Sequence, residues 1–198
     1  MRIAMGYAGT LQQWLETGEI DAAVLYGVER MPHIDSQPLL EEPLWVVGPT
    51  AARLRRQRPM ALAKLVGKPM ILPNGPHGIR TLVDHACAVA NVELQIVCET
   101  NAMSIQKSLV LGGHGFTILP PIAFAGELES KQVSATPLAE PRITRTIVRA
   151  LPSNRAVGAP VRRTVELLVK CVEDAVRRGE WLEASWIGDQ ARRVGTHG

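Results

Sequence analysis

The stretch QKSLVLGGHGFTILPPIAFAGEL, residues 106–128, changes its pattern several times in close succession. Apolar residues at helical spacing predict a helix over 102–111, and the apolar run 116–119 predicts a short buried strand. Two prolines end this strand, and the segment 122–128 predicts a second, short helix. A helix, a strand and a helix that follow one another so closely are typical of an α/β protein.

The glycines around His114 occupy the turn between the first helix and the strand. A phosphate-binding loop runs from a strand through glycines to a helix N-terminus, and here that order is reversed. Gly112 or Gly113 is expected to take the left-handed conformation that ends a helix, and Gly115 to let the chain enter the sheet tightly. His114 is expected to face solvent. The loop is therefore interpreted as a turn and not as a catalytic element.

The same alternation of strands and helices extends in both directions from this stretch. The near-continuous apolar run 19–27 is typical of a strand buried on both faces of a parallel sheet. The segment 160–178 predicts a long helix with one apolar face and three acid–base pairs at i,i+4 outside. No sustained period follows it, and residues 179–198 are expected to form a loose tail. The remaining strands are predicted over 2–7, 41–49, 69–73, 93–99, 132–138 and 142–151, and helices over 9–18, 60–66 and 78–90.

The composition is that of a soluble globular protein. The 198 residues are 46% hydrophobic and 21% charged, enough for one large domain or two small lobes. Aromatic residues make up only 4%, which disfavours a platform for stacking nucleic-acid bases. The basic run RLRRQR, residues 53–58, is interpreted as a solvated surface. Without a signal peptide or a long apolar span, the protein is expected to be cytoplasmic and to have no membrane partner.

Signatures of catalysis and of metal binding are missing from the sequence. The three cysteines are far apart, as expected of free thiols in a reducing compartment. The five histidines are scattered, and no nucleophile elbow, P-loop lysine, zinc-protease motif or strand-led dinucleotide fingerprint occurs. We therefore expect no enzyme activity, no catalytic residue, no metal and no cofactor.

Three predicted helix starts carry polar or glycine residues directly after a predicted strand. They are Gly9-Thr10, Asn74-Gly75-Pro76-His77 and Thr100-Asn101. Taken singly, Thr10 and Asn101 are best interpreted as helix N-caps. Taken together, they predict a pocket for a small polar molecule, because ligands of open α/β sheets bind where helix N-termini offer free N–H groups.

Five segments in sequence order resemble the effector-binding domain of LysR-type transcriptional regulators. They are LQQWLETGEIDAAVLYG, QPLLEEPLWVVGP, ALAKLVGKPMILP, QKSLVLGGHGFTILPPIAFAGEL and PLAEPRITRTI, within residues 2 to about 177. The resemblance implies a type 2 periplasmic-binding-protein-like α/β fold, in which two doubly wound lobes are joined by two crossing segments. Mapped onto this chain, lobe one is 1–46 plus 149–178, lobe two is 47–148, and 179–198 is the tail.

The resemblance also implies an effector-binding function. The effector would lie in the cleft between the lobes, and its binding would change the arrangement of a dimer or tetramer that controls a promoter. An anion is expected, because His77 and Arg80 flank the second helix start. By position, the implied effector-binding residues are Gly9, Thr10, Asn74, Gly75, His77, Thr100, Asn101, Gly115 and Phe116, the last two at the edge of the cleft.

The sequence departs from the family at its N-terminus. Neither the winged helix-turn-helix nor the first strand and helix of the effector domain is recognisable, so promoter DNA would be contacted only through a part not present in this chain. The interpretation is an incomplete regulator that arose through a misassigned start, a fragment or a decayed gene.

Two alternatives share the bilobal scaffold. A solute-binding protein of a transporter is disfavoured by the missing signal peptide. An enzyme such as a phosphoribosyl transferase or a dehydratase would need a phosphate loop or paired carboxylates facing the cleft, and the sequence offers neither.

Overall fold

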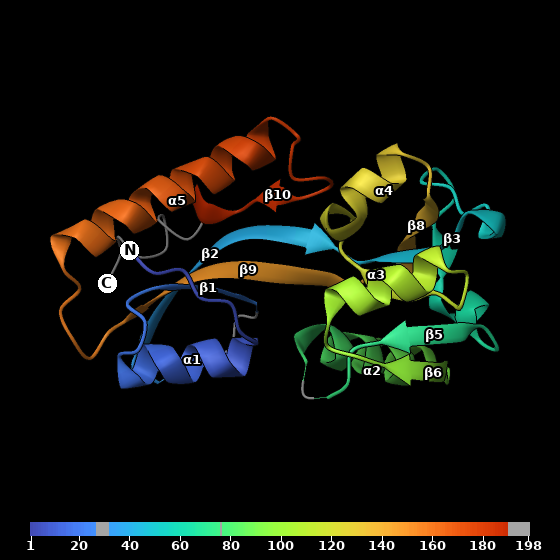
Figure 1. Cartoon of the computed structure of the whole chain (residues 1–198), viewed down its shortest axis with the longest axis horizontal. Helices are drawn as coiled ribbons and strands as arrows, with labels where there is room; N and C mark the ends of the chain where they lie inside the picture. Colours follow the sequence, from blue (N-terminus) through green and yellow to red (C-terminus); the bar gives the residue numbers. More distant parts are fainter. Residues whose placement is uncertain (27–31, 76, 190–198) are drawn as a thin grey trace. The chain divides into compact units, whose positions relative to one another are not determined.

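The computed structural model describes residues 1–26, 32–75 and 77–189, and the chain divides into two compact units (Figure 1). Unit 1 is formed by Met1–Glu42 and by the chain from Arg145 onward, and unit 2 by Pro43–Thr144. The chain therefore leaves unit 1 once and returns to it once. The boundaries proposed from sequence, after residues 46 and 148, each lie a few residues downstream of these positions.

Unit 1 is built on a four-stranded sheet in the order β1-β9-β2-β10. Its strands are β1 (Ala23–Tyr26), β2 (Ile34–Pro43), β9 (Thr144–Pro152) and β10 (Ser185–Trp186), and its helices are α1 (Ala8–Thr17) and α5 (Ala159–Arg177). A small apolar cluster forms a core between α1, β1, β2 and β9: Leu15, Leu25, Ile34, Val148 and Ala150.

The structure corrects the sequence-based expectation for the first part of unit 1. Residues 2–7, predicted as a strand, form none, and the side chains of Ile3 and Met5 are exposed. The predicted strand 19–27 is reduced to β1, with Gly27 outside the described residues. β1 pairs antiparallel with β9, in the register Ala23↔Ala150, and of its side chains Leu25 is buried. The expected parallel pairing of this strand is therefore wrong, and its partner comes from the returning part of the chain.

The strands of unit 2 form two groups. They are β3 (Trp45–Pro49), β4 (Met60–Ala61), β5 (Pro69–Leu72), β6 (Gln95–Glu99), β7 (Thr117–Leu119) and β8 (Val133–Glu140), in the orders β4-β8-β3-β7 and β5-β6. β5 pairs with β6, and β4 with β8, in parallel, whereas β3 is antiparallel to both of its neighbours. Phe116 joins the two groups, because its N–H donates to the Pro69 carbonyl and its carbonyl accepts from the Ile71 N–H, at 2.8 and 2.7 Å.

The helices of unit 2 follow the sequence prediction closely, with one exception. α2 (Gly78–Ala90) and α3 (Met103–Leu111) match, and the predicted helix 122–128 is a 3₁₀ turn, Pro121–Phe124, followed by α4 (Ala125–Glu129). The predicted helix 60–66 is wrong: the chain forms β4 and a 3₁₀ turn, Leu62–Leu65. Leu62 and Leu65, both fully buried, anchor this turn in the core of unit 2.

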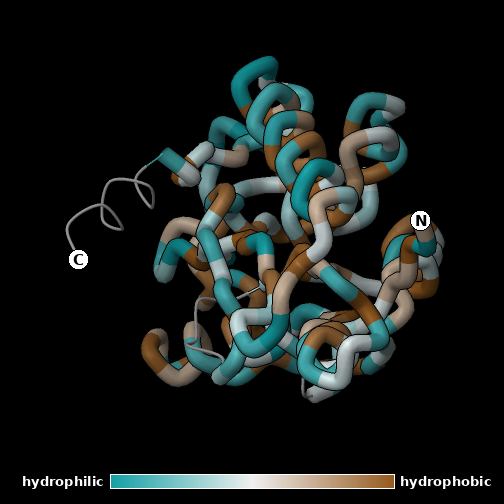
Figure 2. The backbone as a smooth tube through the Cα atoms, turned by 90° about the vertical axis from the view of Figure 1, so that its left-hand side faces the viewer, coloured by the Kyte–Doolittle hydropathy of each residue, from teal (hydrophilic) through white to brown (hydrophobic). Residues whose placement is uncertain are grey.

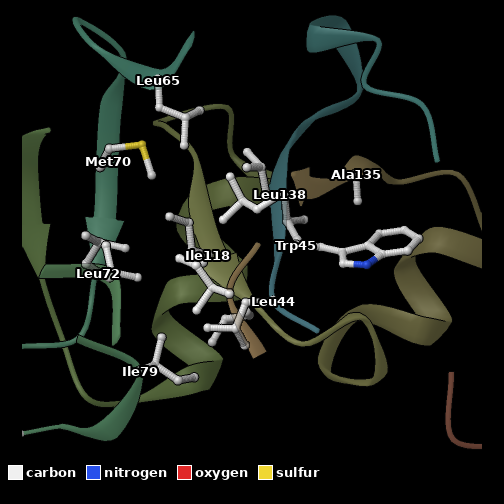
Figure 3. Packing of buried hydrophobic residues seen from close by; sticks show 14 of the residues in the cluster. Leu44, Trp45, Leu65, Met70, Leu72, Ile79, Ile118, Ala135 and Leu138 are labelled. Atoms are coloured by element: carbon white, nitrogen blue, oxygen red, sulfur yellow. The ribbon is translucent and has the colours of Figure 1, made fainter. Parts of the chain in front are cut away.

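The core of unit 2 lies between the strands and their covering helices. In Figure 3, Leu44, Ile118 and Leu138 point toward Met70 and Leu72 of β5, while the Trp45 ring points to the opposite side of its strand. Hydrophobic and hydrophilic residues alternate along the coiled segments, as expected of helices with one buried face (Figure 2). Among the described residues no helix is long and apolar enough to cross a membrane.

Candidate functional site

The candidate site lies in unit 2, where the carboxyl ends of β5 and β6 meet the N-termini of α2 and α3. The two strands run parallel, so the segments that follow them emerge at the same edge of the sheet. The Thr100 N–H donates to the Leu72 carbonyl at 3.0 Å, which holds the chain after β6 against the end of β5. We call the residues at this place the β5–β6 edge: Asn74, Gly75, His77, Thr100 and Asn101.

Asn101 joins the two loops of the β5–β6 edge. Its Oδ1 accepts a hydrogen bond from the Asn74 N–H at 3.1 Å. The predicted N-cap role of Asn101 is wrong: Ala102 precedes the first helical residue of α3, and no side chain caps that helix. The amide is not at the capping position because the helix begins one residue later than predicted. Asn101 therefore fixes one loop to the other instead of ending a helix.

Thr100 and Gln106 hold the start of α3. The Thr100 Oγ1 accepts from the Ala102 N–H at 3.2 Å, and the Thr100 carbonyl accepts from the Gln106 side-chain amide at 2.7 Å. Gln106 is 2% exposed, and its Oε1 is buried without a hydrogen-bond partner in the described structure. Gln106 was not identified from sequence, since a polar residue on a half-exposed helix gives no signal of burial.

His77 precedes α2 and caps its first turn. Its Nδ1 accepts from the Ile79 N–H at 3.2 Å, and its carbonyl accepts from the Thr81 N–H at 3.0 Å. Because Nδ1 is an acceptor, the neutral ring carries its proton on Nε2. The described residues contain no group of three or more metal-ligating side chains.

Arg80 is the basic residue nearest to this edge in sequence, and its charge is neutralised locally. Its guanidinium donates to Glu99, to Asp84 at 2.8 Å and to the Pro73 carbonyl at 3.2 Å. Glu99 first and then Asp84 raise the pKa of Arg80 above its ordinary value. The expectation that Arg80 attracts an anion therefore loses its support, and the positive ends of α2 and α3 are the remaining attraction for negative charge.

Gly115 and Phe116 lie at the other end of β5. A Cβ on Gly115 would meet the Pro69 carbonyl oxygen at 2.5 Å, and Phe116 pairs with Met70. The strand runs from Pro69 to Leu72, so about 10 Å separates these residues from the β5–β6 edge along the strand. The Phe116 ring covers Gly48, where a Cβ would come within 2.5 Å of it, and the Lys68 Nζ lies 5.2 Å from the ring centroid. Within unit 2, Gly115 and Phe116 therefore lie apart from the predicted effector-binding residues of the β5–β6 edge.

Gly9 and Thr10 belong to unit 1. The predicted cap at Thr10 is wrong, because α1 begins at Ala8 and Thr10 lies inside the helix. The residue that precedes the helix is Tyr7, and no side-chain hydrogen bond caps it. Residues 2–7 form no strand, and the helix begins one residue earlier than predicted. Of the remaining predicted residues at the second helix start, Pro76 lies outside the described residues.

Comparison with known proteins agrees with this architecture. Residues 1–171 match the family model for the LysR substrate binding domain. Among curated proteins, the HTH-type transcriptional regulator BbuR of Bordetella bronchiseptica is 28% identical over 174 residues, 87% of this chain and 53% of the relative. The hydrogen peroxide-inducible genes activator of Pectobacterium carotovorum is 24% identical and aligns over 81% of this chain and 52% of its own length. The chain thus spans about half the length of these relatives.

Solved structures with the same fold include ligand complexes. The effector-binding domain of QuiR in complex with shikimate superposes with a TM-score of 0.68 at 24% identity, covering 88% of this chain and 79% of that domain. The regulatory domain of CcmR from Synechocystis PCC6803, in complex with 2-PG, gives a TM-score of 0.75 at 16% identity, covering 84% and 80%. At these identities the likeness establishes the fold: two-unit, type 2 periplasmic-binding-protein-like.

Proposed function

The chain belongs to the LysR substrate-binding domain family, and on that premise we propose that the β5–β6 edge of unit 2 recognises a small polar effector. One observation carries the proposal: the Asn74–Asn101 hydrogen bond holds two loops together at the starts of two helices. The first N–H groups of a helix have no intrahelical carbonyl partner, and Thr100 and Asn101 add a hydroxyl and an amide, so the edge offers preorganised donors to an anionic or hydroxyl-bearing group. Among the effectors expected from sequence, a small organic anion fits this arrangement best.

The individual contacts are proposed as follows. The side chains of His77, Thr100 and Asn101 and the backbone of Asn74 and Gly75 orient the effector on unit 2. Gly9 and Thr10 of α1 remain predicted contacts on unit 1, with Thr10 offering its hydroxyl from the first turn of the helix. Gly115 and Phe116 remain predicted contacts, with weaker support because they lie at the other end of β5.

The biological setting follows from the relatives. Those named above are transcriptional regulators, so we propose that effector binding here controls the arrangement of a dimer or tetramer and thereby the activity of a promoter. DNA contacts would come from a winged helix-turn-helix outside these residues. We further propose that the chain acts in the cytoplasm as a sensor and not as an enzyme.

The test is a thermal-shift screen of the chain against a library of small organic acids, sugar acids and phosphate esters. An effector found in this way is titrated against Thr100→Val, which removes one hydroxyl at the β5–β6 edge. Loss of one hydrogen bond is expected to weaken binding about tenfold. Ser108→Ala, at an exposed position of α3, is the matched control. Equal affinity of Thr100→Val and Ser108→Ala would place the effector elsewhere.

A further inference from the structure

A buried charge pair marks the place where the chain passes between its two units. Glu42 is the last residue of unit 1 before the first passage, and Arg145 is the first residue after the return. Arg145 Nε donates to Glu42 Oε1 at 2.5 Å, and the two side chains are 8% and 0% exposed. Two residues further on, the Leu44 N–H donates to the Ile143 carbonyl at 2.8 Å. The outgoing and the returning strand are thus joined on both sides of the boundary.

The second oxygen of the Glu42 carboxylate is bound from a distant part of the chain. Trp181, in the segment after α5, donates its Nε1–H to Glu42 Oε2 at 2.8 Å. A buried carboxylate is costly unless each of its oxygens is compensated. Arg145 and Trp181 together give each oxygen of the Glu42 carboxylate a hydrogen-bond donor. The Arg145 guanidinium itself lies 4.3 Å from the centroid of the Tyr26 ring, which adds β1 to the cluster.

The segment that carries Trp181 is also attached to β2 by its backbone. Ser185 pairs with Glu41 and Trp186 with Leu40, and the Ile187 N–H donates to the Leu39 carbonyl at 2.9 Å (Figure 1). The Trp186 ring covers Gly188, where a Cβ would meet it at 2.4 Å. Part of the predicted loose tail is therefore bound along residues 39–42 of the outgoing strand.

We propose that the segment 181–188, which we call the strap, is a conformational device that fixes the outgoing and returning strands where they leave unit 1. The strap acts through the Trp181–Glu42 hydrogen bond, because this bond links it to the charge pair that joins β2 to β9. When the bond is broken, both strands lose a constraint at the boundary and open more easily. This property is independent of the effector proposed above, since it requires no ligand.

The test is hydrogen–deuterium exchange of the full 198-residue chain without ligand. Trp181→Phe keeps an aromatic ring but removes the donor, and exchange in peptides covering 39–44 and 143–147 is expected to become roughly tenfold faster. Trp186→Phe is the matched control, because the Trp186 Nε1 is buried without a partner in the described structure. Equal effects of the two variants, or faster exchange in the strap alone after Trp181→Phe, would overturn the proposal.

Two further measurements separate the role of Glu42 from a general loss of packing. In a background with Glu42→Met and Arg145→Met, Trp181→Phe is expected to leave exchange in β2 and β9 unchanged, and a tenfold increase there would contradict the proposal. If Trp181→Phe does not fold, native-state exchange of the unaltered chain in low urea replaces it. The amides of Ile187 and Leu44 should then open as one unit, and opening of Leu44 while Ile187 stays protected would rule the strap out.

Discussion

Gly115 lies between the turn that ends α3 and the strand β7, with its α-carbon facing the backbone of β5. The left-handed position of the turn is Gly113, at φ 79°, as the sequence allowed. At Gly115 the constraint is different, because a Cβ would lie 2.5 Å from the Pro69 carbonyl oxygen. The requirement for glycine at this position is therefore one of space between two strands, which confirms the tight entry into the sheet expected from sequence.

Gly115→Ala is predicted to lower the free energy of unfolding by about 1–3 kcal/mol, because β5 and β7 must separate to admit the methyl group. Urea denaturation measures this change. Gly126→Ala is the control: Gly126 lies in α4, a Cβ there meets nothing within 4 Å, and alanine favours helix by roughly 0.5–1 kcal/mol. A Gly115→Ala variant as stable as the parent chain would contradict the close approach.

The contact between α3 and α4 rests on a charged pair. Lys107 Nζ lies 2.5 Å from Glu127 Oε1 and 5.5 Å from the centroid of the Phe124 ring. The hydrogen bond from Lys107 lowers the pKa of Glu127 below its ordinary value. Both side chains are partly exposed, so the pair makes a modest contribution to stability that salt reduces. It joins two helices that are separate in sequence.

The pH dependence of this contact follows from the direction of the shift. A carboxyl group with a lowered pKa in the folded state stabilises the fold above its ordinary pKa of about 4.3, and this stabilisation is lost as the pH falls through the lower, folded-state value. Glu127→Gln is predicted to lower the melting temperature at neutral pH and to flatten its decline in acid. Thermal melts between neutral pH and about pH 3 check this. Glu129→Gln, at an exposed position on the same helix, should follow the parent curve; if both variants do so, the pair is irrelevant to stability.

At the scale of the whole molecule, the prediction concerns DNA. The basic run 53–58 lies at an exposed turn of unit 2 and has no aromatic neighbours in sequence. Phosphate contacts of this kind give only weak, salt-dependent binding. The 198-residue chain is predicted not to retard duplex DNA at physiological salt in a gel assay, and any smear at low salt should vanish with Arg55→Ser and Arg58→Ser. A sharp, sequence-selective band from this chain alone would contradict the proposal that DNA contacts come from a segment outside these residues.

Elements with local signals could be predicted from the amino-acid sequence. The period of α5 predicted this helix to within a residue or two, because a helix with one buried face repeats its apolar residues every three or four positions. The order of five segments also sufficed to identify the family. The β5–β6 edge could also be predicted, since neighbouring parallel strands end at the same side of a sheet.

The pairing of the strands and the partners of the polar side chains depend on long-range contacts of the folded chain. β1 takes a partner from the returning chain, Asn101 binds Asn74 rather than capping a helix, and Arg80 is neutralised by Glu99 and Asp84. The clearest case is Glu42, whose charge is compensated by Arg145 and Trp181, more than a hundred residues away in sequence. Such contacts leave no period and no local motif, because their energy depends on burial and on partners that only the folded chain brings together.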